Sequence, residues 1–291
     1  MPNNIALFKK YTDLLDEVYK VSATSSVLDM DGALVQAGAN ANEIIIPKMS
    51  MDGLADYDRN SGYVAGDVEI TNETVKFNYE RGRKFAVDAM DNEETAGVAF
   101  GKLSSEFIRL KVAPEIDAFR YATYAGVADI GSTFANLSTG DSVLTALLVA
   151  NSEMDEAEVP KDERYLFITP TLYNIANAVD SYKSRSALEK FTKIIEVPQT
   201  RFYTAINMLD GKSEGEKQGG YTKNAESGRN INFLIVQKGA AIQFSKHVVN
   251  KIFSPDQNQN ADAWQFCYNA YGLTDAYENK AAGIYLHAAE I

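Results

Sequence analysis

The strongest local signal in the chain is a long amphipathic helix pattern between Glu93 and Val112. Apolar side chains recur on one stripe at Val98, Leu103, Phe107 and Leu110, with acidic residues at the start of the segment and basic residues at its end. Pro114 follows this segment, and helices tolerate proline in their first turn. We therefore predict a helix over residues 93–112 that meets a second helix, ending near residue 126, at a bend.

The region before this helix predicts a β-rich hairpin. Residues 43–50 form a strand candidate, and residues 68–77 alternate apolar and polar side chains as a half-exposed strand does. Turn-forming glycines lie between them, and alternation resumes over residues 84–90. The tip of this hairpin contains few large apolar residues. Such a hairpin is marginally stable alone, so we expect it to need a partner surface.

The N-terminal segment also predicts little core of its own. Apolar residues at helical spacing indicate a short amphipathic helix, and residues 22–42 are rich in Ser, Ala, Gly and Asn with weak periodicity. We expect an extended arm that lies on another surface.

The rest of the chain predicts a mixed α/β module followed by more strands. Helices are expected over residues 143–149 and after Pro170. Strands are expected at residues 165–169, 194–197, 202–206, 231–236, 240–244, 248–253, 264–271 and 283–287. The glycine-rich residues 210–230 have the composition of an exposed mobile loop.

The charge balance argues against a protein that grips nucleic acid or anionic lipid. The chain has 40 acidic and 28 basic residues, a formal net charge of -12. A single cysteine, Cys267, closes no disulfide within the chain, and no apolar stretch approaches the ~20 residues that span a bilayer. We expect a soluble protein that is intracellular at synthesis and has no membrane partner.

One segment resembles an enzyme motif. Residues 27–34 are similar to the aspartate motif of haloacid dehalogenase-like phosphatases, with Asp29 and Asp31 as the paired carboxylates. The motif requires a buried strand before the aspartates, whereas a Ser-rich segment precedes them, and Ala33 stands where the family has Thr or Val. Thr169 imitates the second motif, but no later acidic pair completes a magnesium site.

Other catalytic patterns are missing from the sequence. His247 and His287 lack the spacing of zinc ligands, and no serine nucleophile elbow, phosphate-binding loop or dinucleotide fingerprint is present. We predict that the chain is not an enzyme and has no catalytic residues, cofactor or metal ion.

The order of the predicted elements resembles the tailed-bacteriophage major capsid proteins of the Hong Kong 97 fold. Residues 85–95, which enter the long helix, and residues 112–121, which follow it, carry the resemblance, and it extends over nearly the whole chain. It implies an α+β fold with an N-terminal arm, an extended loop at residues 57–77, a spine helix, and peripheral and axial domains.

The resemblance also implies domain boundaries and contact residues. The domains are residues 1–42 (helix and arm), 43–84 (strand and extended loop), 85–127 with 243–280 (peripheral) and 128–242 with 281–291 (axial). Exposed apolar positions outside these domains' cores become candidates for contacts between subunits: Ile5, Phe8, Leu15, Tyr57, Tyr63, Val68, Ile70 and Phe77. Some family members join Lys to Asn between subunits, and Lys76, Lys84 and Asn279 are candidates by residue type alone.

The function implied is that of a major capsid protein. Copies would assemble as pentamers and hexamers into an icosahedral shell that encloses phage or prophage DNA without sequence-specific binding, in the virion and, during assembly, in the bacterial cytoplasm. A separate scaffolding protein and a portal are the expected partners. Two alternatives remain: an encapsulin-like nanocompartment shell protein with the same fold, and the phosphatase built on Asp29 and Asp31.

Overall fold

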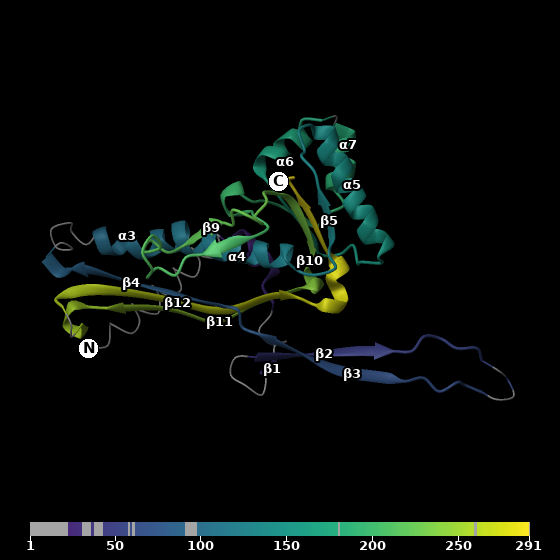
Figure 1. The fold of residues 1–291 in the computed structure, drawn as a ribbon, viewed down its shortest axis with the longest axis horizontal. Coiled ribbons are helices and arrows are strands. Elements are labelled where there is room, and N and C mark those ends of the chain that lie inside the picture. Colours follow the sequence, from purple (N-terminus) through teal and green to yellow (C-terminus); the bar gives the residue numbers. More distant parts are fainter. Residues whose placement is uncertain are drawn as a thin grey trace.

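The structure, a computed structural model, describes residues 23–30, 36–37, 43–57, 59, 62–90, 98–179, 181–258 and 261–290. Figure 1 shows an elongated α+β molecule with three parts. A sheet covered by a long helix lies at one end, a second sheet with three helices lies beside it, and a two-stranded hairpin projects from the other end. The predicted α+β class is confirmed.

The long helix runs through α3 (Val98–Phe107), a π-helical turn (Ile108–Val112) and α4 (Ala113–Ala125). The two predicted helices are present, and the π-helical turn joins them, so the backbone stays helical through the junction. The N–H of Ala113 donates to the carbonyl of Ile108, five residues back. A π turn widens the helix just before Pro114, which has no N–H of its own to donate.

The long helix covers one face of an antiparallel sheet with the order β11-β12-β4. Its strands are β4 (Tyr79–Asp88), β11 (Ala241–Phe253) and β12 (Ala263–Ala276). Phe107 packs edge-on against Phe85 of β4, at 4.8 Å between ring centroids, and also against Phe266 of β12. The two strands expected within residues 240–253 are one strand with a bulge near residue 246.

The second layer is a five-stranded sheet with the order β5-β13-β10-β6-β7. Its strands are β5 (Gly131–Phe134), β6 (Arg164–Ile168), β7 (Lys193–Glu196), β10 (Ile231–Gln237) and β13 (Ile284–Ala288). Helices α5 (Gly140–Glu156), α6 (Pro170–Asn177) and α7 (Ser181–Leu188) cover one face. Tyr121 and Tyr124 of α4 pack on the other, so α4 joins the two layers.

The strand predicted over residues 202–206 is largely wrong. A short helical turn (Gln199–Arg201) precedes these residues, only Ile206 belongs to a strand, and Phe202 is buried against Tyr121 at 5.0 Å between ring centroids. Strand β8 (Ile206–Met208) then pairs with β9 (Tyr221–Lys223). The segment expected to be mobile therefore contains a strand and a series of hydrogen-bonded turns.

The projecting hairpin consists of β2 (Glu43–Met51) and β3 (Val68–Lys76), with the short β1 (Gln36–Ala37) beside β2. The sequence placed residues 84–90 in the same hairpin, but β4 pairs with β12 instead. Four further short helical turns complete the described elements: Thr24–Leu28, Lys238–Ala240, Pro255–Gln257 and Glu278–Gly283. None of the helices in the described ranges has the length and apolarity needed to cross a membrane.

Candidate functional site

The outer part of the hairpin exposes large apolar side chains. Leu54 is fully exposed and Tyr63 is 91% exposed, and Val68 and Ile70 on β3 are also more than half exposed. Tyr57 packs against Tyr63 with 4.9 Å between ring centroids, so the tip presents a small aromatic cluster. Exposed apolar side chains gathered on one projection are typical of a protein-protein contact.

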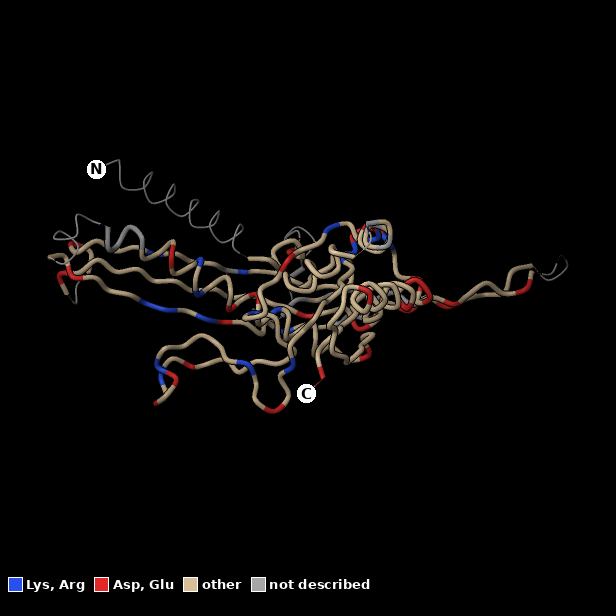
Figure 2. The backbone as a smooth tube through the Cα atoms, turned by 90° about the horizontal axis from the view of Figure 1, so that it is seen from above, with Lys and Arg blue, Asp and Glu red and all other residues tan. Residues whose placement is uncertain are grey.

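The same hairpin is acidic. Residues 51–70 contain five carboxylates and one arginine, and acidic positions are visible along the projection in Figure 2. Asp52 and Asp67 close its neck, because the N–H of Asp67 donates to Oδ2 of Asp52 at 2.8 Å. The hairpin is therefore a projection with both apolar and negative surface.

The other predicted contact residues lie elsewhere. Phe77, at the base of the hairpin, stacks on Tyr271 at 4.7 Å and packs in a cluster with Val75 and Leu273. Its ring therefore has partners within its own chain. Ile5, Phe8 and Leu15 lie outside the described residues, so the structure brings together Tyr57, Tyr63, Val68 and Ile70 only.

A buried carboxylate fixes the start of the described arm to α4. Asp117 is fully buried and accepts hydrogen bonds from the backbone N–H and hydroxyl groups of Thr24 and Ser25, at 2.6 to 3.0 Å. Nη1 of Arg201, from the turn before β8, donates to the same carboxylate at 2.9 Å. Three segments distant in sequence meet at this one side chain. Burial also raises the pKa of the neighbouring Tyr121.

Asp29 belongs to the same network. Its Oδ1 accepts hydrogen bonds from Nη2 of Arg120 at 3.1 Å and from Nε2 of Gln243 at 2.8 Å. The preceding residues, Thr24–Leu28, form a helical turn and not the buried strand that a phosphatase requires. Asp31 lies outside the described residues, and Thr169 is the residue before α6. Asp29 therefore anchors the arm.

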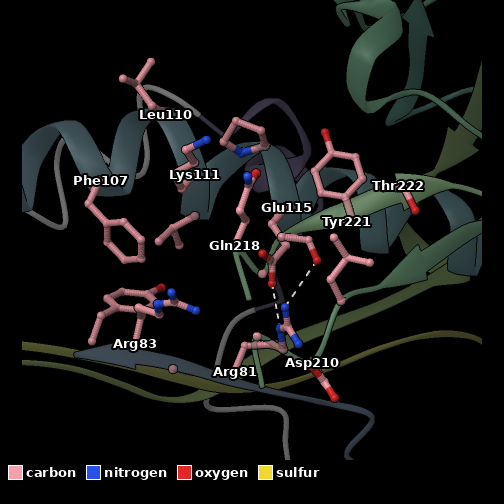
Figure 3. Close-up of a pocket in the computed structure, with 18 of the residues that line it drawn as sticks. Arg81, Arg83, Phe107, Leu110, Lys111, Glu115, Asp210, Gln218, Tyr221 and Thr222 are labelled. Atoms are coloured by element: carbon pink, nitrogen blue, oxygen red, sulfur yellow. Dashed lines mark hydrogen bonds and ion pairs between the residues drawn. The ribbon is translucent and has the colours of Figure 1, made fainter. Parts of the chain in front are cut away.

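The second candidate site is a cleft of about 1320 Å³ between the long helix, β4 and the β8-β9 segment. In Figure 3, Phe107 points from the helix toward the strand that carries Arg81 and Arg83, while Gln218 and Tyr221 come from the opposite wall. Further apolar side chains line the cleft: Tyr79, Phe85, Leu103, Val112 and Tyr268. The cleft thus has a largely apolar interior.

Two arginines of β4 hold the outer wall of the cleft in place. Nε of Arg81 donates to Oε1 of Glu115 at 2.8 Å and its Nη2 donates to the carbonyl of Gly220 at 3.3 Å. Nη2 of Arg83 donates to the carbonyl of Lys217 at 3.0 Å. A Cβ at Gly211, where φ is +72°, would lie 2.8 Å from Nη1 of Arg83. A side chain there would displace the end of Arg83, and glycine adopts this backbone angle with the least strain.

The lining of the cleft contains four basic residues, Arg81, Arg83, Lys111 and Lys223, and three acidic ones, Glu106, Glu115 and Asp210. The acidic lining residues have partners: Glu115 pairs with Arg81, Glu106 pairs with Arg109 at 2.6 Å, and Asp210 accepts hydrogen bonds from its own loop. These hydrogen bonds, led by the one from the Ser213 hydroxyl, lower the pKa of Asp210 to about 2. Within the described part of the chain, Arg83, Lys111 and Lys223 have no recorded ion-pair partner.

Sequence reasoning missed both the hydrogen-bond network of Asp117 and the cleft, although each has a local signal. Every second residue of β4 from position 79 to 85 lies on the same face of the strand. This face therefore carries both apolar and basic side chains: Tyr79, Arg81, Arg83 and Phe85. Asp117 lies on the buried side of α4 close to Tyr121, where an isolated carboxylate is costly. A polar residue in a buried stripe indicates a partner elsewhere in the chain, but it does not identify that partner.

A further exposed apolar patch lies on α5. Leu148 and Val149 are exposed there beside Thr145, Glu153 and Glu156. This patch lies on the helix layer of the five-stranded sheet, away from the hairpin. It combines apolar and acidic side chains, and no described basic residue lines it.

The remaining candidates for chemistry are structural or unplaced. His287 is buried in β13 and stacks on Phe233 at 4.8 Å between ring centroids. Burial lowers its pKa to about 4. The backbone of His247 lies in β11. Among the described side chains, no group of three His, Cys, Asp or Glu residues is arranged to hold a metal ion.

No protein-family model matches the sequence, and no curated protein is similar to it. Solved structures are similar in fold. A chain from Gordonia phage Cozz superimposes with a TM-score of 0.58 at 13% identity, covering 92% of this chain and 87% of that one. The capsid structure of Staphylococcus phage Andhra gives a TM-score of 0.57 at 12% identity, covering 91% and 83%. A virus-like particle from Pyrococcus furiosus gives 0.57 at 10% identity, covering 94% and 95%.

The chain has the Hong Kong 97 capsid fold. The likeness extends over both layers, as the coverage of nine tenths of the chain requires. The hairpin β2-β3 contains most of the residues predicted for the extended loop, and α3 to α4 contains those predicted for the spine helix. The identities of 10 to 13% establish fold alone.

Proposed function

We propose that this protein is a major capsid protein that assembles into the closed shell of a tailed phage or a prophage-derived particle. The observation that supports it best is the acidic, apolar hairpin, which leaves Leu54, Tyr57 and Tyr63 exposed in a chain with a particle-forming fold. A subunit that exposes such a projection gains stability when another copy covers it.

The contact residues that we propose are Tyr57, Tyr63, Val68 and Ile70 on the hairpin, together with Ile5, Phe8 and Leu15. The domain boundaries predicted from the sequence remain part of this proposal, as do hexamers and pentamers, a separate scaffolding protein, a portal, DNA held without sequence-specific contacts, and assembly in the host cytoplasm. The low count of basic residues supports loose contact with DNA, because tight binding would need many phosphate contacts.

The test is negative-stain electron microscopy with light scattering on the purified protein, expressed alone and with its candidate scaffolding protein. We expect closed shells, tubes, or pentamers and hexamers. A compact monomer under every condition would contradict the proposal. Such a result would leave the fold unchanged and remove the shell function.

The alternative is a nanocompartment shell of the same fold, and the similarity to a virus-like particle from Pyrococcus furiosus does not separate it from a phage capsid. The contents of purified particles separate the two. Nuclease-protected DNA would indicate a phage or prophage capsid, whereas a co-purified enzyme inside the shell would indicate a compartment. The phosphatase hypothesis has lost its main support, because Asp29 follows a helical turn and pairs with Arg120.

A further inference from the structure

The chain turns a corner between the projecting hairpin and the layer under the long helix. Strand β3 of the hairpin ends at Lys76, and β4 of the layer begins at Tyr79. Figure 1 shows the chain passing from one to the other near the middle of the molecule. Phe77 and Asn78 alone make this connection. The direction of the hairpin therefore depends on what holds these two residues.

The side chain of Asn78 takes the place of a backbone peptide group at the corner. The pairing of Tyr79 with Gly272 would set residue 77 opposite Thr274 if β4 continued. Instead, Nδ2 of Asn78 donates to the carbonyl of Thr274 at 2.7 Å, and the N–H of Thr274 donates to Oδ1 of Asn78 at 3.1 Å. A carboxamide offers both a donor and an acceptor, as a peptide group does. Buried Thr274 thus keeps partners for its backbone while the chain leaves the sheet.

Phe77 is held by a ring and a cation. It stacks on Tyr271 at 4.7 Å between ring centroids, and Nζ of Lys246 lies 4.9 Å from the centroid of Phe77 and 5.8 Å from that of Tyr271. The register of β11 shifts at Lys246, and a bulge of this kind redirects a side chain. A cation over an aromatic face is attracted to it. The bulge of β11 therefore places a charge that holds the corner.

The arm packs at the same corner. Met30 joins the apolar cluster of Val75 and Leu273, and its N–H donates to the carbonyl of Gln243 at 2.9 Å. Nε2 of Gln243 in turn donates to Oδ1 of Asp29 at 2.8 Å. The corner is thus continuous with the hydrogen-bond network that anchors the arm.

A small rotation at the corner would be large at the tip of the hairpin. Strand β3 has nine residues and spans about 30 Å, at about 3.3 Å per residue. A rotation of about 10° would move its far end by about 5 Å, which exceeds the separation of about 4 Å at which apolar side chains touch. An exposed apolar projection therefore makes a reproducible contact only when its direction is fixed.

We propose that Asn78 and Lys246 are positioning residues, which fix the direction of the hairpin relative to the long-helix layer. Asn78 acts through Thr274, and Lys246 acts through the stacked rings of Phe77 and Tyr271. The consequence for assembly rests on the proposed shell function: a fixed direction gives every copy the same contact geometry, so particles close at one size.

The test is a distance measurement by electron paramagnetic resonance on the unassembled chain. Spin labels are attached at Ile70→Cys on β3 and Lys251→Cys on β11, both exposed, in a Cys267→Ala background. The background chain should give one narrow distance. We expect Asn78→Ala to broaden the distribution about twofold or more, since it removes both hydrogen bonds at the corner. Asn269→Ala, at an exposed asparagine of β12, is the matched control and should leave the width unchanged.

A second variant decides the question if Asn78→Ala does not fold. Lys246→Gln removes the cation over the rings and should also broaden the distribution. A broad distribution in the background chain, or a width in the folded variants equal to that of Asn269→Ala, would overturn the inference. A purely structural role would lower the melting temperature and leave the distance unchanged.

Electron microscopy tests the consequence for assembly. The unmodified chain should form particles of one diameter, and Asn78→Ala should give mixed diameters or open sheets. Uniform particles from Asn78→Ala would contradict the link to particle size. Failure of the unmodified chain to form particles would contradict the shell function itself and leave the distance measurement as the test of positioning.

Discussion

At the scale of single residues, Asp117 shows how a buried charge organises this chain. Its carboxylate accepts hydrogen bonds from Thr24, Ser25 and Arg201, and the neighbouring Arg120 contacts both Ser25 and Asp29. The carboxylate is buried away from water, and a buried charge is costly unless hydrogen bonds satisfy it. One residue therefore joins the arm, the long helix and the segment before β8.

Replacement of Asp117 should destabilise the protein strongly. We expect Asp117→Ala to lower the free energy of unfolding by about 3–5 kcal/mol, because it leaves the partly buried guanidinium of Arg201 and the donors of Thr24 and Ser25 without this acceptor. Urea unfolding measures the loss. The control, Glu80→Ala on the exposed face of β4, should change it by less than about 0.5 kcal/mol. A loss of the same small size for Asp117→Ala would contradict a role in the arm's attachment.

His287 should make stability depend on pH. Its pKa is about 4 in the folded protein against an ordinary value of 6.5. Between these values the unfolded chain binds a proton that the folded chain does not, so the free energy of unfolding should fall as the pH drops from 6.5 to about 4. Nδ1 lies 3.1 Å from Nδ2 of Asn232, and protonation would remove that acceptor.

Thermal unfolding of His287→Gln measures this effect. The variant retains His247 and every carboxylate, so it should lose less stability than the unmodified protein over the same pH window. Parallel curves for the two proteins would show that His287 does not contribute to the pH dependence.

At the scale of elements, β4 controls the segment that forms the outer wall of the cleft. Arg81 and Arg83 point toward the long helix and contact the carbonyls of Gly220 and Lys217, whereas Lys84 lies on the opposite face of the strand. The order of the glycine-rich segment thus depends on a strand more than a hundred residues earlier. Removal of one contact should loosen this wall without unfolding the sheet.

Limited trypsin digestion tests this dependence. We expect Arg83→Gln to increase the rate of cleavage after Lys212 and Lys217 by up to about tenfold. Loss of one such hydrogen bond lowers the stability of the closed segment by about 0.5–1.5 kcal/mol. Lys84→Gln is the matched control and should leave the rate unchanged. Equal rates in both variants would show that Arg83 does not hold the segment.

At the scale of the whole molecule, the hairpin is separable from the two packed layers. The β1-β2-β3 sheet is distinct from the other sheets, and the residues beyond the neck formed by Asp52 and Asp67 are exposed wherever the structure describes their side chains, apart from Gly62. Stability should therefore come from the layers, and assembly from the hairpin.

Removal of the hairpin tip tests this division. We expect a chain in which a short Gly-Ser turn replaces residues 53–66 to melt within about 2 °C of the unmodified protein, because few packed contacts are lost. The same chain should form no shells under conditions in which the unmodified protein does. Normal shells from the shortened chain, seen by electron microscopy, would show that the tip is dispensable for assembly.

The sequence by itself determined most element types and the absence of recognisable catalytic motifs. The stripe of Leu103 and Phe107 predicts a helix with one buried face, and the alternation of Val68 and Ile70 predicts a strand; both patterns are local. The strands of the hairpin could be predicted for the same reason. The resemblance of element order to the Hong Kong 97 fold needed no contact information.

Only the tertiary structure decided how these elements meet. The pairing of β4 with β12, the three segments at Asp117 and the cleft under Arg83 join residues far apart in the chain. Side-chain periodicity shows which face of an element is buried, but it does not show what buries it. The continuous helix through Pro114 and the burial of Phe202 likewise depend on packing, which overrides local preference.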